Sequence, residues 1–226
     1  MVSCGGYNLS GTRMKRFICE QNIARFERLL GEANDEKVRE TLRGLLASSK
    51  RELALLNSET DGANAFPSYH RRMQLADREA VRQQFQPEFD RSPHPYMLLD
   101  PGPGLHIVDI NDAYAAATFI SRADVVGKSL FEIFPDNPDV ALADGVSNLY
   151  ASLRIATETK RPHVMAVQRY DIRDPGGQYV ERHWQPINTP IHDDASRVIF
   201  LLHHVEDVTD EVLSSSQGVT DQARTG

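Results

Sequence analysis

The spacing of apolar residues changes once along the chain. Up to about residue 57 they recur every three or four positions, the period of a helix with one buried face. From Tyr96 onward the period shifts toward two, which is typical of strands whose side chains alternate between two faces. The pattern therefore divides the chain into a helical part and a part that contains a sheet.

The helical part predicts two helices joined by a tight turn. Ile23 and Leu30 lie two turns apart on one helix face, and Gly31 is a residue type that ends many helices. Asp35 can cap a second helix. Such a hairpin has one apolar side and too little core to be stable alone. A hairpin that only pads the domain and a dimerisation device both agree with this pattern.

The boundaries of the regions follow from composition. The run from Asn57 to Pro67 is polar and reads as a linker, and Ser68 to Phe85 has a thin apolar stripe that predicts a helix ended by Pro87. The two ends of the chain are rich in Gly or Ser. We expect five regions: a disordered start at 1–12, a helical hairpin at 13–57, a linker and helix at 58–87, a sheet domain at 88–210 and a disordered tail at 211–226.

The sheet domain predicts two strands, several short helices and three more strands. This order is typical of an α+β domain with an antiparallel sheet. The most apolar run, Val198 to Leu202, predicts a strand that is buried on both faces, and Asp207 to Thr209 form its polar exit. The expected strands are 96–99, 105–110, 164–172, 179–187 and 198–205, and the expected helices are 113–119, 122–126, 130–134 and 143–159.

Charge and composition exclude several functions. The net charge is −7, whereas nucleic-acid binding requires clustered Lys and Arg. No stretch approaches the ~20 apolar residues of a membrane span, and the first 16 residues lack a signal peptide's apolar core, so we expect a cytoplasmic protein. His203 and His204 point to opposite faces of one strand and cannot chelate one ion together. We find no metal-ligand spacing and no catalytic motif, and we expect neither a metal site nor enzymatic activity.

Five short motifs in order resemble those of PAS domains. They are Asn111-Asp-Ala-Tyr114, Asp124-Val-Val-Gly-Lys128, Asp174-Pro-Gly-Gly177, Asp193-Asp194 and Asp207-Val-Thr209. The resemblance covers roughly residues 88–210. Two longer segments, at 134–138 and 167–172, resemble the corresponding segments of PAS modules in bacterial two-component sensors. The resemblance implies a PAS fold, a five-stranded antiparallel sheet with short helices on one face, here preceded by the hairpin and the linker helix.

The resemblance also implies a pocket between the sheet and its helices. A hairpin closed by residues 190–196 would place Trp184 opposite His203, or His183 there if the register shifts by one residue, with Tyr170 on the neighbouring strand. These three side chains would form an aromatic cluster with polar tips, unless they are ordinary core residues whose tips are hydrogen-bonded. Phe131 and Leu149 complete the candidate pocket.

The cofactors of known PAS proteins can be compared by residue type. Haem-binding members carry an axial His on the long helix, and the expected helix at 143–159 contains none. Covalent chromophores attach through a Cys, and residues 20–226 contain no Cys. We therefore expect neither haem nor a covalent chromophore, and the cofactor, if there is one, stays unknown.

The predicted function is a non-enzymatic sensory or regulatory protein in signal transduction. Its PAS domain would bind a small ligand or a protein partner. The alternative is a ligand-independent scaffold that oligomerises and docks a separate histidine kinase or transcription regulator. A separate kinase or response regulator is a candidate partner. We expect a homodimer through the N-terminal helices. PAS proteins usually pass signals through a helix after the exit, Asp207 and Thr209, but the Ser-rich tail predicts little helix beyond Leu213.

Overall fold

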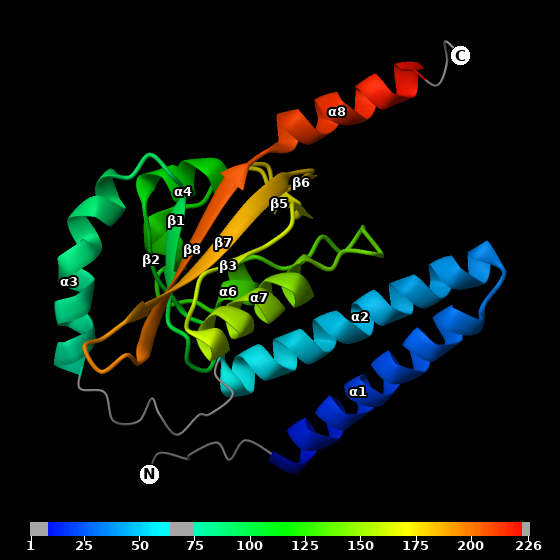
Figure 1. The fold of residues 1–226 in the computed structure, drawn as a ribbon, viewed down its shortest axis with the longest axis horizontal. Helices are drawn as coiled ribbons and strands as arrows, with labels where there is room; N and C mark the ends of the chain where they lie inside the picture. The colour runs from blue at the N-terminus through cyan, green and yellow to red at the C-terminus, as the bar shows by residue number, and fades with distance from the viewer. Residues whose placement is uncertain (1–8, 64–74, 223–226) are drawn as a thin grey trace.

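A computed structural model describes residues 9–63 and 75–222. Within this part of the chain, an antiparallel sheet has the strand order β2-β1-β8-β7-β3, and β4 also pairs with β7 (Figure 1). Because β3 and β4 share one edge, the sheet is five strands wide, as predicted. The strands are β1 Tyr96–Leu99, β2 Ile107–Ile110, β3 His163–Val164, β4 Gln168–Arg169, β7 His183–His192 and β8 Val198–Asp207. A separate ladder joins β5 Ile172–Arg173 to β6 Tyr179–Val180.

Helices cover both faces of the sheet. On the inner face, buried side chains of four helices pack against β1 and β8 in the main core. On the outer face, α3 packs through Phe85 and Phe89 against Leu98 and Phe200. The helices of the inner face are α4 Asp112–Thr118, α5 Arg122–Val125, α6 Leu130–Ile133 and α7 Gly145–Thr159, and α3 spans Leu75–Arg91. Within the described residues, no helix is both long and apolar enough to cross a membrane.

The alternation along the central strands explains these two cores. Met97 and Leu99 point to the inner face, whereas Leu98 between them points to the outer face, and all three are fully buried. Leu201 on β8 follows the same rule, because it pairs with Leu99. A continuous apolar run is therefore required in both strands, and the expectation of a strand buried on both faces at 198–202 is confirmed.

The predicted hairpin is present and is longer at both ends. Helix α1 covers Leu9–Glu32 and α2 covers Glu36–Asp61, with the Asp35 carboxylate accepting the N–H of Val38 at 3.1 Å. Residues 9–12 are thus helical rather than disordered, and residues 58–61 continue α2 rather than starting the linker. Figure 1 shows α2 between α1 and α7. The α2 helix ends at Gly62, whose φ of 63° favours glycine.

Two further boundaries differ from the prediction. Helix α3 runs through Pro87 to Arg91, because the turn after the proline places Phe89 in the outer core. The start of the predicted helix, at 68–74, and the last part of the predicted linker, at 64–67, lie outside the described residues. At the other end, α8 covers Thr209–Gln222, so the expectation of a disordered tail from residue 211 was wrong. Asp210 and Glu211 in its first turn suit the positive end of the helix dipole.

The register of the last hairpin also differs from the prediction. Trp184 pairs with Asp207, and His203 pairs with Asn188, so Trp184 and His203 are not opposite each other. The turn lies at Asp193–Arg197, where the Asp193 carboxylate accepts the N–H groups of Ala195 and Arg197. The strands therefore extend further toward the turn than residues 190–196 suggested. Pro190 is a strand residue that pairs with Leu201.

Candidate functional site

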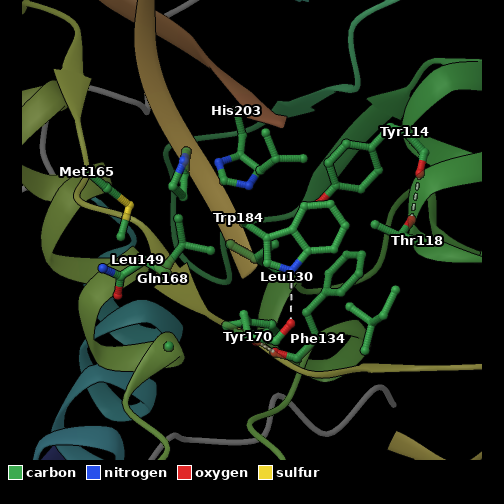
Figure 2. A pocket seen from close by; sticks show the side chains of 14 residues that line it. Tyr114, Thr118, Leu130, Phe134, Leu149, Met165, Gln168, Tyr170, Trp184 and His203 are labelled. Atoms are coloured by element: carbon green, nitrogen blue, oxygen red, sulfur yellow. Dashed lines mark hydrogen bonds between the residues drawn. The ribbon is translucent and has the colours of Figure 1, made fainter. Parts of the chain in front are cut away.

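A small cavity of about 50 Å³ lies between the inner face of the sheet and helices α4, α6 and α7. Drug-sized ligands occupy pockets of about 300–1,000 Å³, so this cavity suits only a few atoms as it stands. Figure 2 shows the side chains that line it, most of them aromatic or aliphatic. The backbone at Gly145 lies close to the Tyr170 ring, because a Cβ atom at this position would be 2.0 Å from the ring. Glycine at the start of α7 therefore lets Tyr170 close the cavity.

Four of the five predicted pocket residues line this cavity. Tyr170, Trp184, His203 and Leu149 do so, and Figure 2 shows them around one space. Phe131 is buried in the main core but does not line the cavity. Its neighbours on the chain, Leu130 and Phe134, line it instead, because residues four apart share one side of a helical turn.

The polar tips of the aromatic cluster are hydrogen-bonded within the protein. The indole Nε1–H of Trp184 donates to the Tyr170 carbonyl at 2.9 Å, and the Tyr170 hydroxyl donates to the Phe134 carbonyl. The ring Nδ1 of His203 contacts Asn188 Oδ1 at 2.7 Å. These bonds match the interpretation of the cluster as ordinary core packing. They leave a small space with mostly apolar walls.

A buried polar chain leads from the cavity to α7. Asn188 Nδ2 donates to Ser152 Oγ at 2.7 Å, and Ser152 Oγ contacts His163 Nδ1 at 2.7 Å. Since Asn188 donates through Nδ2, its Oδ1 accepts from His203, which assigns the proton of His203 to Nδ1. Burial, with a smaller contribution from His204, lowers the pKa of His203 to about 3. His203 is therefore a neutral imidazole.

Two polar atoms remain available to a molecule in the cavity. In the described part of the chain, neither His203 Nε2 nor the Tyr114 hydroxyl has a hydrogen-bond partner, and both residues line the cavity. Their rings meet edge to face at 6.2 Å. Burial raises the pKa of the Tyr114 hydroxyl, so this group is a neutral donor. The cavity thus offers one donor and one acceptor within apolar walls.

The predicted exit connects β7 to α8. The N–H of His183 donates to Thr209 Oγ1 at 2.9 Å, and the N–H of Val208 donates to the His183 carbonyl at 2.8 Å. The N–H of Thr209 donates to Asp207 Oδ1 at 3.0 Å. Thr209 is 5% exposed. The first turn of α8 is therefore fixed to the residue that precedes Trp184 in the chain.

The sequence did not indicate that Asn188, Ser152 and Tyr114 belong to the site. Asn188 is a buried amide on the inward face of β7, the same face as Trp184 and Pro186. The alternation from Trp184 onward carries a signal for it. The register of the hairpin was needed to place it opposite His203.

Comparison with known proteins supports the assignment of the sheet domain. A family model described as PAS fold matches residues 89–213, slightly more than half of the chain. No curated protein matches significantly. Solved structures with a similar fold include the PAS domain of the fruit-fly ELK potassium channel, with 17% identity, a TM-score of 0.42 and coverage of 56% of this chain and 96% of that one.

Two further solved structures illustrate the range of similar proteins. A PAS domain from Colwellia psychrerythraea has 14% identity and a TM-score of 0.44, and covers 57% of this chain and 98% of its own. An RNA-binding light-oxygen-voltage receptor has 13% identity and a TM-score of 0.44, and covers 96% of this chain and 67% of its own. At these identities the likeness concerns the fold alone.

Proposed function

The chain belongs to the PAS fold family, whose domains are sensory and signalling modules, and we propose that it senses a small, largely apolar molecule without catalysing a reaction. The molecule would occupy the cavity beside Trp184, and the change would pass through the exit to α8. The single observation that carries this proposal is the continuity from the cavity to α8. Trp184 lines the cavity, and its neighbour His183 bonds Thr209 at the start of the helix.

The walls of the cavity define the class of ligand. With about 50 Å³ between apolar side chains, it favours a molecule of few non-hydrogen atoms. One polar group on that molecule could accept from Tyr114 or donate to His203 Nε2. Such a ligand would displace Trp184 slightly, and β7 would carry the displacement to His183 and Thr209.

A direct test uses Trp184, because it is the only tryptophan of the chain. Native mass spectrometry of the purified protein would detect a ligand that copurifies. Titration with butanol and butanone would then be followed by the fluorescence of Trp184. We expect saturable changes in the natural protein and none in Leu149→Phe, which fills the cavity from α7. A variant on the exposed side of α7, Ile155→Phe, is the control and should respond like the natural protein.

A second candidate function is the ligand-independent scaffold that docks a histidine kinase or a transcription regulator. The small volume of the cavity and the hydrogen-bonded tips of Trp184 and Tyr170 favour it. If no probe changes the fluorescence of Trp184 and no ligand copurifies, the small-molecule proposal fails and the scaffold stands.

We further propose that the protein forms a homodimer through its N-terminal helices. Helix α1 packs on α2 and exposes three apolar residues at helical spacing. They are Met14, Phe17 and Ile18, which are 60%, 56% and 48% exposed, respectively. A second copy of this face would cover them. Light scattering of Phe17→Glu should show a monomer. Val164→Glu, at an equally exposed valine of the sheet edge, should leave the mass unchanged.

A further inference from the structure

Three side chains on the outer face of the sheet converge at one point, away from the cavity. His94 Nδ1 lies 2.6 Å from Glu206 Oε1, and His204 Nε2 lies 2.7 Å from the same oxygen. The ligand atoms of all three residues lie within 4.8 Å of one another. Their side chains are 54%, 22% and 42% exposed for His94, His204 and Glu206, so solvent reaches the group. We call these residues the outer-face triad.

The strand register brings these residues together. On β8, His204 and Glu206 are two residues apart and share one face, whereas Val205 between them points to the cavity. Tyr96 on β1 pairs with His204. The N–H of Val205 donates to the Pro95 carbonyl at 3.3 Å, which continues the ladder beyond the end of β1. His94, two residues before Tyr96, therefore lies opposite Glu206.

The chemistry of the triad is that of a site for a transition-metal ion. Two imidazole nitrogens and one carboxylate oxygen form a set of protein ligands that is common for zinc, with the remaining position open to water. Tetrahedral zinc with bonds of about 2.0–2.1 Å separates its ligand atoms by about 3.3 Å. Each nitrogen would then move roughly 0.7 Å further from Oε1, a change that rotation of the exposed His94 and Glu206 side chains can supply.

The ring of Tyr96 lies beside both histidines of the triad. The Tyr96 ring meets the His204 ring edge to face at 5.1 Å and lies 6.4 Å from the His94 ring. The imidazoles of His94 and His204 are 5.4 Å apart and at 75° to each other. Both rings thus have a packed side and a side that faces Glu206.

We propose that His94, His204 and Glu206 bind a divalent transition-metal ion, for which Zn²⁺ is the expected choice. The sequence predicts no metal site, because the usual short spacings of metal ligands do not occur along the chain. His94 and Glu206 are 112 residues apart, and the pairing of β1 with β8 brings them into contact. A bound ion would join the segment before β1 to β8, one residue before Asp207. This site is independent of the cavity and of the ligand proposed for it.

The test is titration of the full, untagged protein with Zn²⁺ and with Co²⁺ after removal of metals by a chelator. Calorimetry should show one Zn²⁺ per chain, and Co²⁺ should give visible absorption bands of a nitrogen and oxygen site. The melting temperature should rise with Zn²⁺, because the ion binds the folded state. His94→Ala and Glu206→Gln should each weaken binding roughly 100-fold or more, since removal of a ligand costs at least as much as removal of a supporting residue.

Glu181→Gln is the matched control. Glu181 Oε1 lies 2.9 Å from His183 Nε2, and its side chain is 40% exposed, so it resembles Glu206 but has a single histidine contact. This variant should bind Zn²⁺ like the natural protein. The proposal is wrong if the natural protein does not bind Zn²⁺. It is also wrong if His94→Ala and Glu206→Gln bind Zn²⁺ as tightly as the natural protein does. Circular dichroism spectra of the variants confirm that loss of binding is not loss of folding.

Discussion

The helices before the sheet and the helix after it are attached to the PAS domain in different ways. Helices α2 and α3 are held from the side by arginines that reach buried carboxylates of the domain: Arg51 contacts Asp136, and Arg82 contacts Asp109. Helix α8 is held at its first turn through Thr209, and Figure 1 shows it projecting beyond the sheet.

This difference shows which helix can move independently. A helix bound along its side moves with the domain, because tilting it would leave a buried carboxylate without its arginine partner. A helix held at one end can tilt when that end shifts by a small amount. We infer that α2 and α3 move with the domain as one body. We also infer that α8 is the helix that tilts when a ligand enters the cavity. Loss of a side contact should therefore cost stability, whereas loss of the end contact should change mobility.

The largest effect is expected for Asp109→Asn. The Asp109 carboxylate is 1% exposed and contacts Arg122 through both oxygens, at 2.5 and 2.6 Å, and Arg82 at 2.7 Å. Asn keeps the shape but removes the charge between two arginines. We expect a loss of about 3 kcal/mol in the free energy of unfolding, measured by urea denaturation. Asp90→Asn is the control, because Asp90 contacts the same Arg122 at 3.5 Å in an exposed pair and should cost less than about 1 kcal/mol.

The next effect is expected for Asp136→Asn, which weakens the attachment of the hairpin. Asp136 accepts from Arg51 Nε at 2.6 Å and from the N–H of Val146 at 3.0 Å, and its side chain is 3% exposed. We expect a loss of about 2 kcal/mol and faster proteolytic cleavage in α2. The half-exposed pair between Arg16 and Asp61 gives the control: Asp61→Asn should leave the cleavage rate unchanged. Equal rates in the two variants would contradict the attachment through Asp136.

A smaller effect is expected from acid. Burial alone would raise the pKa of Asp109, but hydrogen bonds and charge from Arg122, followed by the charge of Arg82, hold the pKa below its ordinary value. The unfolded state then binds a proton more readily than the folded state. The contribution of Asp109 is therefore complete above about pH 4 and is lost as the pH falls below it. Unfolding followed from pH 6 to pH 3 should show a shallower decline in Asp109→Asn. An identical decline would remove Asp109 from the acid response.

The same contrast explains how far the sequence could predict the structure. The PAS motifs and the alternation in Val198–Leu202 located the sheet and four residues of the cavity. The register failed because Pro190 suggested a loop, whereas the Asp193 carboxylate closes a turn further along. Register depends on such local hydrogen bonds, which composition does not reveal.

The C-terminal helix and the outer-face triad were missed for different physical reasons. Ser214 to Ser216 have moderate helix propensity, which is a weak guide when the first turn is fixed by Thr209 and favoured by Asp210 and Glu211. The triad depends on the pairing of β1 with β8, and the spacing of residues along the chain does not show that His94 lies beside His204 and Glu206.

The smallest effect on stability is expected for Thr209→Val, although this variant tests the attachment of α8 most directly. Valine keeps the shape of threonine but removes the oxygen that accepts the N–H of His183 and donates to Asp207. The cost should be about 1 kcal/mol. Amide hydrogen exchange at residues 209–215 should become roughly fivefold faster, as a loss of that size implies, with exchange in α2 unchanged. Thr159→Val is the control, because Thr159 is exposed and its hydroxyl donates to the Ile155 carbonyl. It should change neither the free energy of unfolding nor the exchange at residues 209–215. Exchange that rises equally in α2 and α8 would mean that the two attachments do not differ, and α8 would then move with the domain as the other helices do.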